Sequence, residues 1–386
     1  MERYFIKAKG FLLEEKQESE KLYLEIDGKS FGSLFSEPPE GAQVLDFSEY
    51  MIAPGLFDTH IHGVNGADVM DGTQASFQTI SEALLSVGVT RFLPTTLTSS
   101  IEELTHVVQE LKAAIEKGMN GAQPEGIYLE GPYFTPEHKG AQNPNYFSDP
   151  SLEDFHALQE ASGNHVVKIA LAPERDHAID FIKAVSAENI KVALGHTNAD
   201  FHTANAAVNA GASIFVHLFN GMRGLHHRDP GTAGACLLNE QTFAELICDG
   251  HHVCSDMVRF AQNVKKDHVV LITDCMKAGL LPEGQYNLGE FPVIVKDGVA
   301  RTEHSGSLAG SILKLIDGVT NIAKWTDLEL YEAWKLGSLS PARSMGVQDR
   351  LGSIAEGKCA DFVVLDDRLS IIDVAVDGEL KHPMTI

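Results

Sequence analysis

Apolar positions in the middle of the chain form short runs that are separated by longer amphipathic stretches. Eight β-leaning runs lie near residues 55–60, 89–95, 126–130, 165–171, 191–195, 213–217, 243–248 and 268–273. Between most of them the apolar residues recur every three to four positions, as in SFQTISEALLSVG (76–88), which indicates helices. Strands that alternate with helices predict a parallel sheet, and eight of them predict a closed, TIM-like (β/α)8 barrel.

The two ends of the chain have a different pattern. YFIKAKGFLL, KLYLEIDGKSFGSLF and AQVLDFSEYMIAP are short β-leaning pieces broken by glycine, proline and charge, and the tail GSIAEGKCADFVVLDDRLSIIDVAVDGEL is similar. We expect a small β-sandwich domain from residues 1–52 plus 350–386, with a catalytic barrel of residues 53–349 between them. The alternative is an open doubly wound sheet, which usually carries a glycine-rich phosphate loop after its first strand. Here that strand is followed by DTHIHGVNGAD.

The amino-acid composition argues against some classes of binding partner. The chain has 54 acidic and 30 basic residues, so its formal net charge of −24 argues against nucleic acid and against an anionic membrane surface. No apolar run approaches the roughly 18–20 residues of a membrane helix, and the N-terminus lacks a signal-peptide core. The five cysteines show no CxxC spacing, which fits a reducing compartment better than disulfides or a thiolate zinc site. We expect a cytoplasmic protein.

Residue types that bind metals or transfer protons follow most of the predicted strands. In a barrel enzyme the chemistry lies at the carboxyl ends of the strands. The residues found there, in chain order, are His60, His62, Glu130, His196, His217, Asp249, His252 and Asp274. His60 and His62 are two positions apart, which puts both side chains on one face of a strand. Imidazole and carboxylate ligands suit zinc, iron, cobalt or manganese, so we predict one or two divalent ions per subunit.

Asp274 is the candidate proton-transfer group. A divalent ion lowers the pKa of bound water toward ~7 and polarises a carbonyl. The reaction also needs a carboxylate that takes the proton of the water and delivers it to the leaving group. Asp274 stands alone after the eighth strand and can serve in this way, although it could instead be one more metal ligand. These residues predict hydrolysis of an amide or a related bond.

Together these residues resemble the amidohydrolase superfamily, whose members often carry a small β domain made from both termini. Within it, the chain resembles the family of N-acetylglucosamine-6-phosphate deacetylases over residues 53–345. The matching segments include APGLFDTHIHG, LEGPYFTPEHKGAQNP, LGHTNA, HLFNGM, HHRDPG, DGHHV, LITDCMKAG and LAGS. The resemblance implies removal of acetate from a phosphorylated amino sugar, which leaves glucosamine 6-phosphate.

The resemblance also implies a role for each matching residue. The main ion is held by Glu130, His196 and His217, and Glu130 also reaches a second ion held by His60 and His62. Asp274 is the acid–base group, and His252 contacts the substrate near its amide carbonyl. The phosphate is met by Asn220, the backbone of Gly221, Arg228 and Gln142, a neutral residue where some members have histidine. Leu308 lines the sugar site. A homodimer is implied, with the loops of Gln142 and Arg228 acting across its interface.

Two alternatives to this function differ in class. One is an amidohydrolase that opens a cyclic amide, of the dihydroorotase or hydantoinase type, which usually bridges two ions with a carboxylated lysine on the fourth strand. Lys168 is on that strand but well before its end, so we interpret it as structural. The other is a binding protein that kept the barrel without catalysis. Such relatives usually lose ligands or the acid, and this sequence retains all of them.

Overall fold

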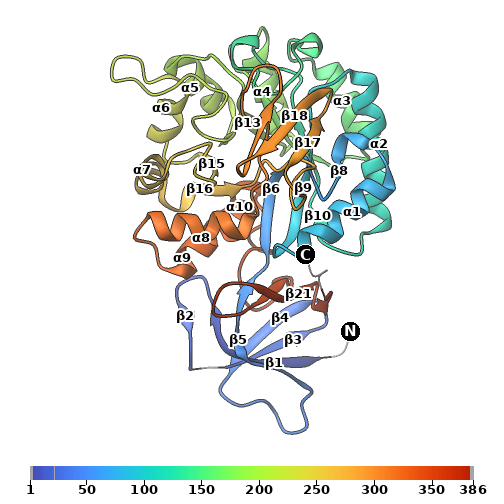
Figure 1. Cartoon of the computed structure of the whole chain (residues 1–386), viewed down its shortest axis with the longest axis vertical. Coiled ribbons are helices and arrows are strands. Elements are labelled where there is room, and N and C mark those ends of the chain that lie inside the picture. The colour runs from blue at the N-terminus through green and yellow to red at the C-terminus, as the bar shows by residue number, and fades with distance from the viewer. Residues whose placement is uncertain (1–2, 21, 383–386) are drawn as a thin grey trace.

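A nearly closed parallel barrel forms the larger part of the computed structural model, which describes residues 3–20 and 22–382 (Figure 1). In pairing order its strands are β6 (Leu56–Ile61), β9 (Val89–Thr96), β11 (Ile127–Glu130), β12 (Val166–Leu171), β13 (Lys191–Leu194), β14 (Ile214–Phe215), β15 (Phe243–Ile247) and β16 (Val269–Ile272). The two-residue β10 (Gln123–Pro124) pairs with β9. All eight predicted runs are strands, and the predicted fold class is confirmed.

Residues just beyond β16 bring the last strand back to the first. The backbone nitrogen of Asp274 donates to the carbonyl of His60 at 2.9 Å. Ile61 and Cys275 form an isolated parallel bridge, and Cys275 also accepts from the backbone nitrogen of His62 at 2.9 Å. The residues that follow β16 are therefore held beside the histidines at the end of β6.

Helices surround the barrel (Figure 1). They are α1 (Gln74–Leu85), α2 (Ile101–Lys117), α3 (Leu152–Ala161), α4 (Ala178–Ala187), α5 (Phe201–Ala210), α6 (Gly231–Leu238), α7 (Ser255–Lys265), α8 (Leu315–Trp325), α9 (Leu330–Leu336) and α10 (Leu339–Met345), with short 3-10 turns at Val69–Asp71, Pro136–His138, Pro144–Tyr146 and Lys266–His268. In α2 the Ser100 hydroxyl caps the first turn by accepting from the backbone nitrogen of Glu103 at 3.2 Å. The buried residues Leu104, Val107 and Leu111 of α2 follow the predicted helical period.

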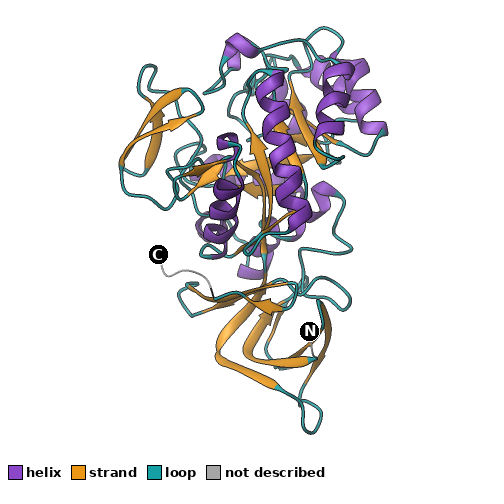
Figure 2. Ribbon diagram, turned by 90° about the vertical axis from the view of Figure 1, so that its right-hand side faces the viewer, coloured by secondary structure: helices purple, strands orange, loops and turns teal. Residues whose placement is uncertain are grey.

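Strands from both chain ends form one sheet, which lies at one end of the molecule (Figures 1 and 2). Its strands are β1 (Tyr4–Leu12), β2 (Gln17–Glu18), β3 (Tyr23–Asp27), β4 (Ser30–Phe35), β5 (Val44–Pro54), β20 (Phe362–Leu365), β21 (Ile371–Val376) and β22 (Glu379–Leu380). Because β5 leads directly into β6, the sheet adjoins the amino ends of the barrel strands. The expected division at 52/53 and 349/350 stays a prediction, and residues 1–2, 21 and 383–386 of it lie outside the described residues.

The carboxyl ends of the barrel strands carry additional strands. A hairpin of β7 (Gly63–Val64) and β8 (Ala67–Asp68) follows β6, and an antiparallel sheet consists of β17 (Gly284–Leu288), β18 (Phe291–Lys296) and β19 (Val299–Thr302). Leu288 and Val293 of this small sheet pack with Leu97, just after β9, and with Met276, after β16. The small sheet therefore covers part of the end where the candidate chemistry lies. Among the described helices, none is long and apolar enough to cross a membrane.

The interior of the barrel is packed rather than hollow. Phe57, Leu93, Tyr128, Ala193 and Ile214, from five different strands, belong to a single buried cluster. The Tyr128 ring lies 5.1 Å from the His60 ring, measured between centroids, so this cluster reaches the histidines. Packing of this kind leaves the carboxyl ends of the strands as the place for a site.

Candidate metal centre

The six residues predicted to bind metal or transfer protons converge at the carboxyl ends of the barrel strands. They are His60 and His62 at the end of β6, Glu130 as the last residue of β11, and His196, His217 and Asp274, each two positions beyond its strand. All six are buried. Parallel strands bring these positions to one end of the barrel although they are far apart in the sequence.

Glu130 lies at the centre of the group. Its Oε1 is 3.3 Å from His60 Nε2, 3.4 Å from His196 Nε2 and 3.5 Å from His217 Nε2. Its Oε2 is 3.3 Å from His62 Nε2. The ligand atoms form two sets that could each hold an ion, one of Glu130, His196 and His217 and one of His60, His62 and Asp274. One carboxylate thus touches the histidines of both sets, which is the arrangement that the family resemblance implies for Glu130.

Backbone carbonyls fix the orientation of three of the four imidazoles. The Nδ1 atoms of His62, His196 and His217 lie 3.1, 2.9 and 3.0 Å from the carbonyl oxygens of Thr95, His138 and Asn220. A carbonyl only accepts, so each Nδ1 carries a proton, and Nε2 is the nitrogen of each ring that can bind an ion. In all three rings Nε2 lies within 3.5 Å of a Glu130 oxygen.

The packing of these nitrogens fits a bound cation. His196 Nε2 and His217 Nε2 are 3.2 Å apart, yet neither can donate to the other when both protons are on Nδ1. His60 Nε2 is buried with no hydrogen-bond partner in the described structure. A divalent ion between such atoms satisfies them together, and nitrogen with carboxylate oxygen suits zinc, iron, cobalt or manganese.

Three residues of the centre adopt the left-handed backbone conformation, which residues other than glycine rarely adopt. The φ angles of His196, His217 and Asp274 are 46°, 31° and 50°. Each such residue costs on the order of 1–3 kcal/mol and persists where its surroundings hold it. For Asp274 the surroundings are the carbonyl of His60, which accepts from its nitrogen, and the nitrogen of Ser311, which donates to its carbonyl at 2.7 Å.

Opposite charges control ionisation at the centre. Burial alone would raise the pKa of Asp274, but His60 and His62 outweigh it and lower that pKa to about 2. Burial likewise opposes ionisation of Glu130, and the surrounding histidines hold its pKa well below the usual range. For His60, burial disfavours the charged form, but Glu130 and Asp274 raise its pKa to about 9. Without an ion, the carboxylates are therefore ionised and His60 carries a proton that an ion would displace.

A cavity of about 230 Å³ opens above the ligands. It is lined by His62, Glu130, His196, His217 and Asp274, and by five of the six predicted substrate residues, Gln142, Asn220, Gly221, His252 and Leu308. His252 Nδ1 is 2.6 Å from Asp249 Oδ2, which leaves Nε2 as the ring nitrogen available to the cavity. Arg228 lies apart in an exposed loop, where its Nη1 is 2.8 Å from His227 Nε2.

Gln142 differs from its expected surroundings. Its Nε2 donates to Glu130 Oε2 at 2.5 Å, and its Oε1 accepts from the backbone nitrogen of Thr98 at 2.9 Å. The side chain is buried and lies at the metal end of the cavity. The phosphate contact expected of Gln142 stays a prediction, and an amide held in this way needs to leave Glu130 in order to make one.

Comparisons with known proteins agree with this geometry. A family model described as the amidohydrolase family matches residues 51–384. The chain belongs to the amidohydrolase family. It is 43% identical over 339 residues to the N-acetylglucosamine-6-phosphate deacetylase of Vibrio furnissii, which covers 88% of this chain and 85% of that protein.

A second relative and a solved structure extend the comparison. The N-acetylgalactosamine-6-phosphate deacetylase of Escherichia coli O157:H7 is 38% identical, over 90% of this chain and 92% of that protein. The crystal structure of N-acetylglucosamine-6-phosphate deacetylase from Pasteurella multocida superposes with a TM-score of 0.93 at 28% identity, covering 98% of this chain and 100% of that one. The likeness therefore includes the barrel and the sheet of the termini.

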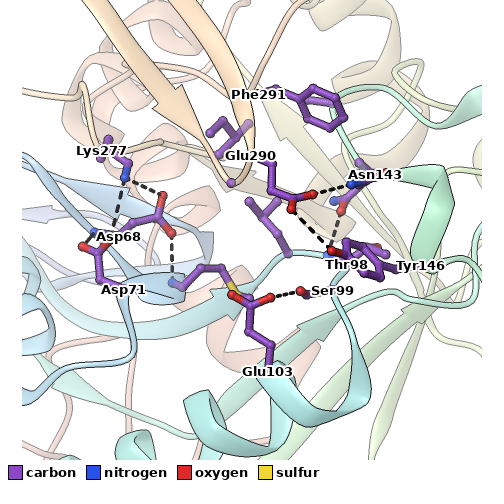
Figure 3. Close-up of a pocket in the computed structure, with 16 residues that line it drawn as sticks. Asp68, Asp71, Thr98, Ser99, Glu103, Asn143, Tyr146, Lys277, Glu290 and Phe291 are labelled. Carbon is purple, nitrogen blue, oxygen red and sulfur yellow. Dashed lines mark hydrogen bonds and ion pairs between the residues drawn. The ribbon is translucent and has the colours of Figure 1, made fainter.

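A second cavity adjoins the metal centre of this amidohydrolase (Figure 3). It measures about 190 Å³ and shares Leu97, Ala141, Gln142 and Leu288 with the first cavity. Its charged lining residues are Asp68, Asp71, Glu103, Glu290 and Lys277. With four carboxylates against one ammonium group, this second cavity disfavours an anionic group.

The small sheet is tied to the loop that carries Gln142. Glu290, in the turn between β17 and β18, accepts from the Asn143 amide and from the Tyr146 hydroxyl at 3.4 Å, as Figure 3 shows. Leu288, at the end of β17, lines both cavities. Strands β17, β18 and β19 were not predicted, because the first five residues of FPVIVK are all apolar and its alternating burial appears only in the structure.

Proposed function

We propose that this protein hydrolyses the N-acetyl group of N-acetyl-D-glucosamine 6-phosphate to give D-glucosamine 6-phosphate and acetate. The observation that carries the proposal is the pair of ligand sets around Glu130, with Asp274 beside them, in a cavity lined by the predicted substrate residues. Two relatives named N-acetylglucosamine-6-phosphate deacetylase, at 43% and 33% identity, support this choice of substrate.

The chemistry divides between the ions and the chain's own residues. Glu130, His196 and His217 would hold a divalent ion, and the chemistry that such an ion would supply is a bound water of lowered pKa and polarisation of the amide carbonyl. Asp274 lines the cavity beside both ligand sets, and its carboxylate would accept the proton of the attacking water and then deliver it to the departing amine nitrogen. His252, whose Nδ1 is held by Asp249 at 2.6 Å, would contact the substrate near its amide carbonyl.

The phosphate is assigned to the end of the cavity at Asn220. The backbone of Gly221 has φ of 56°, and a side-chain carbon there would lie 3.1 Å from His196 Nδ1, so glycine lets the backbone approach the site. Arg228 would supply the charge, because its planar fork matches phosphate oxygens. Its exposed loop suits a contribution across a homodimer interface, and we infer such a dimer.

A cyclic-amide hydrolase is the competing function within the family. That reading needs Lys168 as a carboxylated bridge between ions. Lys168 Nζ instead donates to Glu245 Oε1 and to the carbonyl of Thr59 at 3.2 Å, and Glu130 is the carboxylate that touches both ligand sets. These contacts favour the deacetylase over the cyclic-amide hydrolase.

All five cysteines are unpaired in the described chain, which suits the cytoplasmic location that we propose.

The deciding experiment is an assay of acetate release from N-acetylglucosamine 6-phosphate. We expect turnover with zinc, iron, cobalt or manganese present, and its loss after treatment with a chelator. N-acetylgalactosamine 6-phosphate, run in parallel, tests the choice of sugar, because a relative at 38% identity is named for that substrate. No acetate from either sugar in metal-loaded protein would contradict the proposal, whereas turnover of a cyclic amide would favour the rival.

Replacing Arg228 by alanine tests the phosphate site. We expect KM for the phosphorylated sugar to rise roughly 10- to 100-fold, the value of one charge-assisted hydrogen bond, with little change for N-acetylglucosamine itself. Arg223→Ala is the matched control, because Arg223 lies in the same loop but pairs with Asp229. Steady-state kinetics with both sugars give the answer, and equal increases in KM would remove Arg228 from phosphate binding.

A further inference from the structure

His60 is held differently from the other three histidines of the metal centre. The Nδ1 atoms of those three face backbone carbonyls, but His60 Nδ1 lies 3.4 Å from Oε2 of Glu245, a carboxylate in the middle of β15. In the barrel β15 is separated from β6 by β16, and Glu245 is 1% exposed. It belongs to neither set of possible ligands.

Glu245 is in turn held by a buried lysine. Lys168, on β12, donates from Nζ to Glu245 Oε1 and to the carbonyl oxygen of Thr59, next to His60. The same ammonium group lies 3.8 Å from the centre of the Tyr128 ring. Lys168 is fully buried, so Lys168, Glu245 and His60 form a connected polar chain that runs from the barrel interior to the metal centre.

The contacts from Lys168 through Glu245 to His60 determine which nitrogen of His60 can bind an ion. A carboxylate only accepts, so Glu245 keeps a proton on Nδ1 of His60 and leaves Nε2, which faces Glu130 and Asp274, as the nitrogen that can bind an ion. A carboxylate behind an imidazole also makes the ring a better ligand than a carbonyl does. Lys168 balances the charge of Glu245, which would otherwise be costly in a dry interior. An ion pair of this kind adds little stability of its own compared with apolar residues of the same shape, so stability alone does not account for it.

We propose that Glu245 is a positioning residue for the ion at His60 and His62, and that Lys168 holds Glu245 in place. The inference rests on the metal-dependent function proposed above. It goes further because different groups hold the histidine rings of the two ion sites. In the site of His60 and His62, the His60 ring is held by a side chain of the barrel interior and the His62 ring by the carbonyl of Thr95. Both histidines of the other site are held by backbone carbonyls alone. A change at Glu245 should therefore weaken one ion and leave the other.

The test is a titration of metal-free protein with Co²⁺, followed by absorption and calorimetry. We expect the unchanged protein to bind two ions and Glu245→Gln to bind one of them 10- to 100-fold more weakly. Against a His60→Ala background, Glu245→Gln should have no further effect on binding. Equal weakening of both ions, unchanged binding, or a single ion in the unchanged protein would overturn the inference.

Two further variants separate positioning from stability. Lys168→Met with Glu245→Gln removes both charges, which avoids an unpaired buried lysine, and it should show the same selective loss. Glu125→Gln disturbs a different buried ionic cluster, around Arg91, and should leave both ions unchanged although it destabilises the fold. Selective ion loss in a protein that releases no acetate would overturn the proposed substrate and support this inference.

Discussion

Asp274→Asn is expected to reduce turnover of the acetylated sugar by about 10²- to 10⁴-fold, the usual contribution of a proton-transfer group. The amide of asparagine cannot accept the proton of the attacking water at neutral pH, whereas Asp274, with its pKa lowered to about 2, is ionised. Asparagine is among the side chains that tolerate the left-handed backbone found there, so the variant should fold. Steady-state kinetics with excess metal measure the effect.

Asp297→Asn is the matched control for this experiment. Asp297 lies in an exposed turn and has φ of 53°, close to the 50° of Asp274, so both variants lose one charge from the same backbone conformation. The control should keep full turnover. Asp274 could also be a ligand together with His60 and His62. Low turnover at limiting metal that returns to the unchanged value in excess metal would identify it as a ligand alone. Turnover within a few-fold of the unchanged protein at every metal concentration would exclude it from proton transfer.

The strands and the positions of the candidate ligands could be predicted because the barrel has a strong local signature. Strands that are buried on both faces read as continuous apolar runs, such as VVLI of β16, and the end of each run marks where chemistry can lie. His196 and His217 are both two positions beyond such an end. The strands and the residues at their ends can both be predicted without knowing which strands pair. This is because the carboxyl ends of all parallel strands lie at the same end of the barrel.

Contacts across the barrel could not be predicted in the same way. Lys168 and Glu245 interrupt apolar strands, which signals a buried partner, but 77 residues separate them and no local pattern pairs them. The position of Gln142 beside Glu130 depends on the path of a long loop and on a single backbone donor, Thr98. Arg228 stands outside the cavity of the single chain, and its proposed role depends on a second subunit. These features arise from tertiary packing rather than from periodicity.

The second large effect is expected at the junction between the barrel and the sheet of the termini. Arg91, on β9, is 7% exposed, and its guanidinium binds both carboxylate oxygens of Asp361, from Nε at 2.6 Å and from Nη2 at 3.0 Å. It also contacts Glu125 at 3.0 Å and Asp377. Because Asp361 precedes β20, this cluster joins the C-terminal strands to the barrel.

Arg91→Ala should lower the free energy of unfolding by about 3–5 kcal/mol, because it leaves buried carboxylates without their cation. Arg350→Ala is the control: Arg350 also binds Glu125, but its side chain is 51% exposed, and the expected loss is at most about 1 kcal/mol. Burial raises the pKa of Asp361 and Arg91 opposes that rise, so in the variant Asp361 takes up a proton more readily when folded than when unfolded. The loss should therefore be largest at neutral pH and shrink as acid protonates Asp361. Urea unfolding at several pH values measures both effects, and equal, small losses in the two variants would show that the cluster does not hold the two parts together.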